Sequence, residues 1–468
     1  MAVLVWVLWP RLGHSFPSLI DDWSAIADSP SQLRDALLLG MPEELRYRPA
    51  WVVWNNVQWY TLGAPVDRIG PQFWGLVRVA ILIVGLTAAA AALSRRTARG
   101  SSRPRSILVA GAVLAVVTVP AFAVDIARFG PQEPLLVGLM CGGAALFAYA
   151  LRRALDGEDG RLAVFAAVAA VPVWWAGVGQ KESSVCALVL VPFIALALRS
   201  HRRELSRIPG RMRTLLWACA AAGSLAFVPV VVRTVQLAAA DERVYGAEPQ
   251  SRTAEKALRQ LAEMGSAIDS PTGWIVLVLA IALIAGTLLE RRPDWLAIGL
   301  LVTAFAFLAF AGSTEVVVSR YYIPTVALLA LVATRLAPDL RSRLLWATGC
   351  LLLVIGLVQA PEARARVQDW VAWERAGETL VREGARRQAA GCRVDVTGPD
   401  IELVDAYPVL VPFAGSAGGG CETDDVFLVV LTGNYPLDED PEDPHLRRCG
   451  TGAEEVLRNE VGRLLRCQ

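Results

Sequence analysis

The sequence predicts a mainly α-helical protein, a polytopic membrane helix bundle of about 11 spans followed by a small α/β domain. Of its 468 residues, 54% are hydrophobic and only 19% are charged, and the mean hydropathy is +0.44. A soluble domain of this length has far fewer apolar residues. Apolar runs recur as far as Gln359, and beyond it the hydropathy falls. The net charge of +1 gives no reason to expect a nucleic-acid partner, and membrane lipids are the expected surroundings.

Ten apolar runs approach the length of about 17–25 residues that a membrane-spanning helix needs. Charged residues, Pro or Gly bound each of them. Several are short, so tilted neighbours or flanking polar residues must complete them. The runs are Phe73–Leu93, Ser106–Val124, Leu135–Leu151, Leu162–Val178, Ser184–Leu198, Thr214–Val232, Trp274–Leu289, Trp295–Ala311, Ile323–Leu336 and Leu344–Gln359.

An eleventh apolar run, Met1–Trp9, is too short to span a bilayer at about 1.5 Å per residue. It lacks the basic start and the small-residue cleavage site of a signal peptide. A misplaced start codon is one explanation, and a clipped first helix in the outer part of the bundle is the one that we favour.

Basic residues concentrate in alternate short loops, which predicts the orientation. The other short loops hold little more than Arg128, Lys181 and Arg320. By the positive-inside rule the basic loops are cytoplasmic. The long loops 10–70 and 233–273 and the tail after Gln359 are then outside the cell membrane. The basic loops carry Arg95, Arg96, Arg99, Arg103, Arg105, Arg152, Arg153, Arg161, Arg199, Arg202, Arg203, Arg207, Arg211, Arg213, Arg291, Arg292, Arg341 and Arg343.

Two adjacent carboxylates, Asp21 and Asp22, follow the first apolar segment in the sequence LIDDW. Acids at a membrane surface suit two roles: a general base that takes a proton from a hydroxyl, or ligands for a divalent cation such as Mg²⁺ or Mn²⁺. A solvated turn or a helix cap is the structural alternative. We predict that this pair is the centre that the other outer loops face.

The rest of the first outer loop predicts two helices that lie in the membrane interface. The first starts at Pro30 and stops at Gly40, and the second is Trp51–Leu62, which contains Trp51, Trp54, Trp59 and Tyr60. These aromatic side chains are typical of an interfacial belt, and stacking on a sugar ring is the functional alternative. Between the helices, Pro49 favours an extended Arg48, so that Arg46 and Arg48 either pair with the acids or bind an anion.

Three later outer loops place ionisable residues at the ends of spans. They carry Glu133 before Pro134, Lys181 with Glu182, and Arg320 with Tyr321. Charges at this depth are costly unless they are paired or functional, and the cations indicate an anion site. Glu182 could instead neutralise Lys181. The loop 233–273 contains an amphipathic patch, Thr253–Met264, which we expect to form a lid or rim.

The tail after Gln359 predicts a soluble domain, so that we divide the chain at 1–360 and 361–468. We expect a charged helix Glu362–Gln388, strands Arg393–Thr397 and Val426–Leu431, and a last helix Ala453–Leu465, with a mixed segment at 401–411. An acidic loop at 438–443 lacks the ligand spacing of a known calcium loop, and a solvated loop is the better interpretation.

The cysteines divide between spans and tail. Cys141, Cys186, Cys219 and Cys350 lie in apolar spans, whereas Cys392, Cys421, Cys449 and Cys467 lie in the tail. Four cysteines in an outer domain predict two disulfides; a zinc site would need closer Cys pairs.

The predicted last helix disfavours one of the three possible disulfide pairings. A helix over Ala453–Leu465 would be close to 20 Å long, which disfavours joining Cys449 to Cys467. Two pairings remain, Cys392 with Cys467 and Cys421 with Cys449, or Cys392 with Cys449 and Cys421 with Cys467, and we favour the first.

Residues 1–340 resemble the GT-C type glycosyltransferases that use polyprenyl-phosphate sugars, such as the protein O-mannosyltransferases and the aminoarabinose transferases. The resemblance rests on Asp21-Asp22, Tyr47-Arg48-Pro49, Glu133, Lys181-Glu182 and Arg320-Tyr321, in this order and on one side. It implies that Asp21 or Asp22 deprotonates an acceptor hydroxyl, which attacks the anomeric carbon with inversion. Arg320, Lys181, Arg48 and Tyr321 would hold the donor phosphate, with Glu133, Glu182 and Arg46 in support.

The resemblance thus implies a hexosyl- or pentosyltransferase with a polyprenyl-phosphate sugar as donor and a glycan, lipid or protein as acceptor. A divalent cation, if used, would bind Asp21, Asp22 and Glu133. No Gly-rich phosphate loop or cytoplasmic Asp-x-Asp motif indicates a nucleotide-sugar donor. A polysaccharide polymerase or ligase, a transporter or flippase of lipid-linked sugars, and a non-catalytic envelope-assembly protein remain alternatives.

Overall fold

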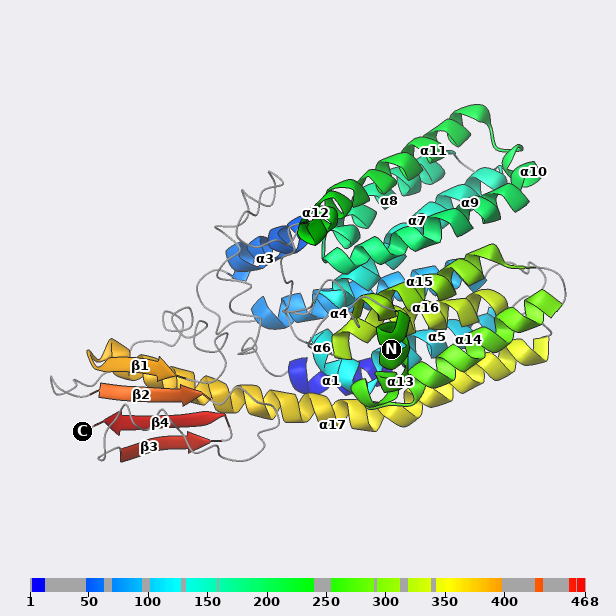
Figure 1. Ribbon diagram of the computed structural model, residues 1–468. Coiled ribbons are helices and arrows are strands. Elements are labelled where there is room, and N and C mark those ends of the chain that lie inside the picture. Colours follow the sequence, from blue (N-terminus) through cyan, green and yellow to red (C-terminus); the bar gives the residue numbers. More distant parts are fainter. Residues whose placement is uncertain are drawn as a thin grey trace.

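The computed structural model of the protein describes residues 2–12, 48–62, 70–94, 102–127, 132–157, 160–239, 254–289, 293–311, 319–337, 342–397, 426–431, 454–459 and 461–467. Within these ranges the chain forms a bundle of long helices (Figure 1), and one long helix leads from the bundle to a four-stranded sheet.

The first half of the chain supplies the helices α1 (Ala2–Leu12), α3 (Pro49–Leu62), α4 (Gly70–Leu93), α5 (Ser102–Val117), α6 (Pro120–Ala127), α7 (Glu133–Leu155), α8 (Gly160–Val178), η2 (Glu182–Val189, a 3₁₀ helix), α9 (Leu190–Ser200), α10 (Arg202–Leu205), α11 (Gly210–Leu225) and α12 (Phe227–Ala239). The second half supplies α13 (Ala254–Ala267), α14 (Thr272–Leu289), α15 (Trp295–Ala311), η5 (Ser319–Tyr322), α16 (Ile323–Leu336), α17 (Ser342–Ala389), β1 (Arg393–Thr397), β2 (Val426–Leu431), β3 (Glu454–Asn459) and β4 (Gly462–Cys467).

Each of the ten predicted spans coincides with helix in the structure, so the predicted helical bundle is confirmed. Among the described residues, seven helices are long and apolar enough to cross a membrane, or eight if one bent pair counts as a span. The helices α15 and α16 have only 17 and 14 residues. Apolar side chains cover the outside of the bundle; Phe165 is 71% exposed and Val358 is 72% exposed. The chain is a multi-pass membrane protein.

The predicted span Ser106–Val124 is broken rather than straight. The helices α5 and α6 meet at an angle of 83°. At the break, the Thr118 hydroxyl donates to the carbonyl of Leu114 at 2.7 Å and lies 3.0 Å from the carbonyl oxygen of Gly356. Pro120 follows, and its missing N–H ends the helical ladder. Asp125, in the last turn of α6, is buried.

The last span and the charged helix predicted after it form one helix, α17, of 48 residues, although Pro361 lies inside it. The predicted boundary at residue 360 therefore falls within a helix. At about 1.5 Å per residue, α17 is roughly 70 Å long, more than twice the thickness of a bilayer core. Its second half carries the sheet away from the bundle, as Figure 1 shows.

Small residues bring the helices of the bundle into close contact. A Cβ atom on Gly85 of α4 would collide with the carbonyl oxygen of Gly138 in α7. A Cβ atom on Gly138 would in turn lie 2.7 Å from the carbonyl oxygen of Ile81. Helices in lipid gain stability from such close backbone packing, because the hydrophobic effect does not drive them together there.

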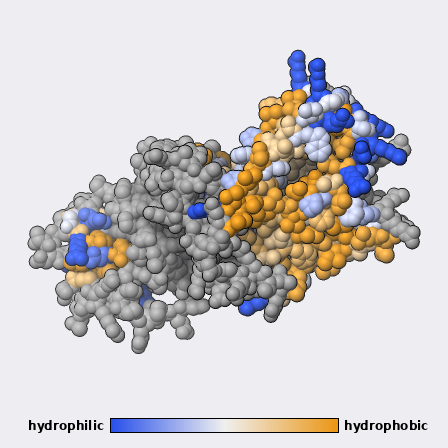
Figure 2. Space-filling view, turned by 45° about the horizontal axis from the view of Figure 1, so that its top comes forward, coloured by the Kyte–Doolittle hydropathy of each residue, from blue (hydrophilic) through white to orange (hydrophobic). Residues whose placement is uncertain are grey.

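Arginines gather at one end of the bundle, here called the basic end, where α9, α10 and α11 meet. Figure 2 shows hydrophilic residues at this end and an apolar band beside them. The described arginines in this region are Arg152, Arg153, Arg161, Arg199, Arg202, Arg203, Arg207, Arg211 and Arg213. The positive-inside rule predicts that these arginines are on the cytoplasmic side.

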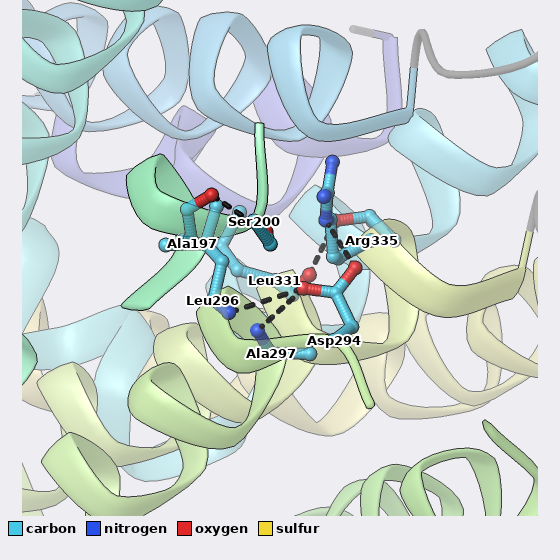
Figure 3. A network of polar contacts seen from close by, with 8 residues as sticks. Ala197, Ser200, Asp294, Leu296, Ala297, Leu331 and Arg335 are labelled. Carbon is cyan, nitrogen blue, oxygen red and sulfur yellow. Dashed lines mark hydrogen bonds and ion pairs between the residues drawn. The ribbon is translucent and has the colours of Figure 1, made fainter. Parts of the chain in front are cut away.

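A buried ion pair stabilises the basic end. Asp294 accepts hydrogen bonds from the backbone N–H groups of Leu296 and Ala297 at 3.1 Å each, and thereby caps α15. Its second carboxylate oxygen lies 2.9 Å from Nε of Arg335 in α16. Figure 3 shows this carboxylate between the start of α15 and the Arg335 side chain. Both of its oxygens are therefore bonded, as a buried carboxylate requires.

The sheet has the strand order β1-β2-β4-β3. The strand β2 pairs with β1 in parallel and with β4 in antiparallel orientation. One face of the sheet packs on the end of α17, where Phe427 and Leu464 contact a cluster that includes Trp370 and Trp373. The strands predicted at 393–397 and 426–431 are confirmed with these bounds.

The predicted last helix, Ala453–Leu465, is wrong, because this segment forms the antiparallel hairpin of β3 and β4. The Asn459 side chain accepts hydrogen bonds from the backbone of Val461 and Gly462 at 2.9 and 3.2 Å and fixes the turn. Its amide group also donates to the carbonyl of Ala376 in α17. Helix-forming residues such as Glu and Leu are thus overridden by turn chemistry and pairing with β2.

The disulfide prediction assumed that a helix about 20 Å long separates Cys449 from Cys467. The hairpin removes that assumption. Cys392 and Cys467 are each disulfide-bonded, and Cys421 and Cys449 lie outside the described residues. In the sheet, Arg393 and Cys467 are both aligned with Val426, on opposite sides of β2. Two strand spacings of about 4.8 Å each exceed the Cα separation of about 7 Å that a disulfide tolerates. The register therefore argues against joining Cys392 to Cys467.

We expect a non-reduced proteolytic digest to contain no peptide that joins Cys392 to Cys467. Each should instead be linked to one of the two remaining tail cysteines, and the hairpin makes Cys449 with Cys467 acceptable. Mass spectrometry before and after reduction measures this directly. A Cys392–Cys467 peptide would show that the strand register is wrong.

Candidate functional site

Ionisable residues meet at the end of the bundle opposite the basic end, here called the site end. Arg48 precedes α3, Glu133 begins α7, Lys181 and Glu182 follow α8, and Arg320 lies in η5. These five residues are called the ionic cluster. They come from four separate parts of the sequence, so only the tertiary fold brings them together.

An ion pair between Lys181 and Glu133 lies at the centre of the ionic cluster. Both residues are buried, at 4% and 1% exposure. The Lys181 ammonium lies 4.0 Å from the centre of the Tyr321 ring, and the Arg320 guanidinium lies 5.8 Å from the same ring. Aromatic faces attract cations, so Tyr321 holds two positive groups close together. Lys181, Arg320 and Tyr321, which the resemblance assigned to one phosphate site, are thus adjacent in the structure.

A second ion pair joins Arg48 to Glu182 at 2.7 Å. The sequence left open whether Glu182 neutralises Lys181. In the structure Glu182 instead accepts a hydrogen bond from Arg48, and Lys181 donates to Glu133. The start of α3 also docks on the turn after α8, because the N–H of Ala50 donates to the carbonyl of Gly179 at 3.1 Å. A Cβ atom on Gly179 would come within 2.9 Å of Ala50. This contact fixes α3 against the turn that carries Lys181.

Local sequence explains how the chain presents these groups. Glu133 is in the first turn of α7 with Pro134 beside it, where a negative charge is favoured by the helix dipole and Pro suits the helix start. Lys181 has an extended backbone before η2. A 3₁₀ helix of 8 residues is unusually long, because its hydrogen-bond geometry is poorer than that of an α-helix. The span after Lys181 therefore begins in 3₁₀ geometry and becomes α-helical only at Leu190.

The charges of the ionic cluster suit an anion. Its five residues carry three positive and two negative charges, counting only residues that the structure describes. Burying a cation is costly unless a carboxylate or another anion pairs with it. The carboxylates of Glu133 and Glu182 supply that pairing, so the cations remain in place at the site end.

Two hydrogen bonds beside the cluster were not predicted from the sequence. The Ser319 hydroxyl donates to Asp125 at 2.9 Å and so ties η5 to the end of α6. The hydroxyl of Tyr322 donates to the side-chain oxygen of Gln260 in α13. Burial, with the charge of Glu263 as a smaller cause, raises the pKa of Tyr322 to about 12, so this phenol keeps its proton. An acid in an apolar stretch, as at Asp125, was the only sequence signal.

The N-terminal helix is bound to α17 by another unpredicted ion pair. Arg11 lies 2.6 Å from Glu374, and both are buried. The second oxygen of Glu374 accepts a hydrogen bond from the indole of Trp370 at 2.6 Å. Arg11 is in the last turn of α1, which directly precedes the loop that contains Asp21 and Asp22. The start of the first loop is therefore fixed to the helix that carries the sheet.

The predicted acids Asp21 and Asp22, and Arg46, lie outside the described residues, so their roles stay predictions. Among the described residues there is no group of three His, Cys, Asp or Glu side chains that could hold a metal ion. Glu133, the described member of the predicted ligand set, bonds Lys181. The described residues alone therefore do not form a divalent-cation site.

Replacing one partner of the Lys181–Glu133 ion pair should destabilise the protein more than replacing both partners with apolar residues. In Glu133→Leu, the buried ammonium loses its carboxylate, and we expect a loss of about 3–5 kcal/mol. The double variant Glu133→Leu/Lys181→Met should lose clearly less. Thermal unfolding of the detergent-purified protein compares them, with the exposed Glu204→Gln as control, expected within about 0.5 kcal/mol. Equal losses in the single and double variants would contradict the assigned pairing.

Comparisons with known proteins agree with this architecture. The structure of ArnT from Cupriavidus metallidurans in the apo state matches with a TM-score of 0.58 and 11% identity, over 100% of this chain and 97% of ArnT. ArnT bound to undecaprenyl phosphate matches over the same shares with a TM-score of 0.57 and 12% identity. These matches confirm the predicted GT-C-like fold.

One further solved structure and a family model also match this chain. An oligosaccharyltransferase from Archaeoglobus fulgidus, tethered to an acceptor peptide, matches at 11% identity with a TM-score of 0.45, over 90% of this chain and 63% of that one. A search of the curated proteins found no match. A family model, described as a family of unknown function (DUF6541), matches residues 59–323, which is more than half of the chain and includes Glu133, Lys181 and Arg320. The chain belongs to this family of unknown function, DUF6541.

Proposed function

We propose that this protein is a membrane glycosyltransferase that transfers a sugar from a polyprenyl-phosphate donor to an acceptor hydroxyl on the outer face of the cell membrane, with inversion at the anomeric carbon. The ionic cluster is the observation that carries the proposal, because it collects buried cations at one end of an apolar bundle. The fold supports it, since ArnT shares the fold over its length and has a structure bound to undecaprenyl phosphate.

The cations would bind the donor phosphate. Lys181 and Arg320 lie against the same Tyr321 ring, so a phosphate at this position would meet an ammonium and a guanidinium together. Arg48 would add a third positive group. These groups stabilise a negative charge that grows as the phosphate leaves, which lowers the barrier rather than merely binding the substrate.

The first outer loop would supply the base. Asp21 or Asp22 takes the proton of the acceptor hydroxyl, and its oxygen attacks the anomeric carbon. The bond between that carbon and the phosphate oxygen breaks, and its electrons leave with the polyprenyl phosphate. Nothing in this step needs a redox partner or a nucleotide. No step is assigned to a metal ion.

The membrane surface of the bundle suits the remainder of the donor. Its exposed side chains are apolar over α8, α14 and α17, as for Leu289 at 85% exposure. A prenyl chain could lie along such a surface while its phosphate reaches the site end. The acceptor would be a glycan, a lipid or a protein, and the transferred group a hexose or a pentose.

Asp21→Asn or Asp22→Asn should abolish sugar transfer while the protein inserts and accumulates normally, because an amide cannot accept the hydroxyl proton. A loss of at least about a hundredfold is expected for a general base. Transfer assays on membranes of equal protein content measure it, with the exposed Asp156→Asn at the basic end as control. Wild-type rates in both single variants would exclude Asp21 and Asp22 as the base and with them the proposed mechanism.

Arg320→Ala should weaken donor binding more than Arg320→Lys, because the guanidinium fork is lost in both but the charge only in the first. Binding of undecaprenyl phosphate to the purified variants measures the difference. Arg207→Ala, an exposed arginine of the basic end, is the matched control. Equal and negligible effects of both changes would remove Arg320 from the phosphate site.

Cells that lack the protein identify the substrate pair. Their lipid extracts should accumulate one polyprenyl-phosphate sugar, and one glycan or glycosylated product should be missing. Accumulation on the cytoplasmic face would instead favour a flippase.

A further inference from the structure

Four side chains in the segments 132–133 and 180–184 have buried polar atoms without a hydrogen-bond partner. They are Oε1 of Gln132, Oε2 of Glu133, Oε1 of Gln180 and Oγ of Ser184. The four residues are buried, with exposures of 7%, 1%, 2% and 0%. Buried polar atoms in folded proteins are nearly always bonded, so each exception needs an explanation.

Other buried carboxylates of the chain show that Glu133 is unusual. Asp294 uses both oxygens, one toward the backbone of α15 and one toward Arg335, as Figure 3 shows. Glu374 also uses both, one toward Arg11 and one toward Trp370. Glu133 bonds Lys181 through Oε1 only and leaves Oε2 without a partner. Fold stability accounts for the first two arrangements but not for the third.

The four atoms belong to two short segments that the Lys181–Glu133 pair holds together. Gln132 occupies the N-cap position of α7 directly before Glu133, but its side chain makes no capping hydrogen bond. Gln180 directly precedes Lys181, and the N–H of Ser184 donates to the carbonyl of Lys181 at 3.0 Å, one 3₁₀ turn later. The residues with unbonded atoms are thus neighbours, along the chain or through one backbone hydrogen bond, of the ion pair whose cation the proposed function assigns to the phosphate.

The chemistry of these atoms selects the ligand. The oxygens of Gln132, Glu133 and Gln180 can only accept hydrogen bonds, and the Ser184 hydroxyl can accept or donate. A phosphodiester offers no hydrogen to such acceptors. A sugar ring offers several hydroxyl groups next to its phosphate. We propose that Gln132, Gln180 and Ser184, with Oε2 of Glu133, form a subsite for the hydroxyl groups of the donor sugar; this rests on the proposed function.

The same chemistry would fit an acceptor glycan or ordered water. The position next to Lys181 favours the donor, because the anomeric carbon is bonded to the phosphate oxygen, so the sugar must lie beside the phosphate. Binding of the donor lipid measured without any acceptor distinguishes a subsite for the donor sugar from one for an acceptor glycan. Water alone would leave no dependence on the sugar.

The test uses Gln132→Met/Gln180→Met, because methionine keeps the length of glutamine and cannot hydrogen-bond through its end. Removing unbonded polar groups from the interior should leave thermal stability equal or higher. The control is Thr348→Val in α17, whose buried hydroxyl also has no partner but which belongs to another part of the bundle. The full-length proteins in nanodiscs are titrated with undecaprenyl phosphate, alone and carrying mannose, glucose or arabinose.

We expect the wild type and Thr348→Val to bind at least one sugar-bearing lipid about tenfold or more tighter than undecaprenyl phosphate. The double Met variant should bind undecaprenyl phosphate as the wild type does but lose this preference. The subsite is overturned if the variant keeps the preference, or if the wild type prefers none of the three sugars. Failure of the wild type to bind undecaprenyl phosphate would refute the proposed function itself, whereas retention of preference in the variant would leave it intact.

Discussion

The buried ion pair between Lys181 and Glu133 is the contact on which the site end depends. It joins the start of α7 to the turn after α8, and the ammonium also lies against the ring of Tyr321. Because an unpaired charge in this setting is costly, each partner restrains the other. The phosphate-binding cation that we propose is thereby held in place before any donor arrives, which reduces the cost of binding.

The long helix α17 connects the membrane bundle to the sheet as one continuous element. The pair Arg11–Glu374 and the indole of Trp370 fasten α1 to the same helix. The beginning of the loop with the predicted acids and the C-terminal sheet thus share one support. The sheet packs directly on the second half of α17 through Trp373 and Phe427.

Hydropathy predicted the helices of the bundle well, since about 20 apolar residues in a membrane leave the backbone no alternative to a helix. The strands at 393–397 and 426–431 were also predicted, because short β-branched runs have few alternatives. The hairpin at 454–467 was missed. Its residues have helical propensity, and only the Asn459 turn and the pairing with β2 make them strands.

The sequence by itself determined the membrane class, the positions of the spans and the residue types available at the site end. It did so because apolar length and the placement of charges are local properties of the chain. The tertiary structure alone decided that Glu133 pairs with Lys181 and Glu182 with Arg48. It also decided that the oxygens of Gln132 and Gln180 stay without a partner. Partner choice depends on which ends of distant helices meet, and helix packing through small residues such as Gly85 and Gly138 sets that geometry.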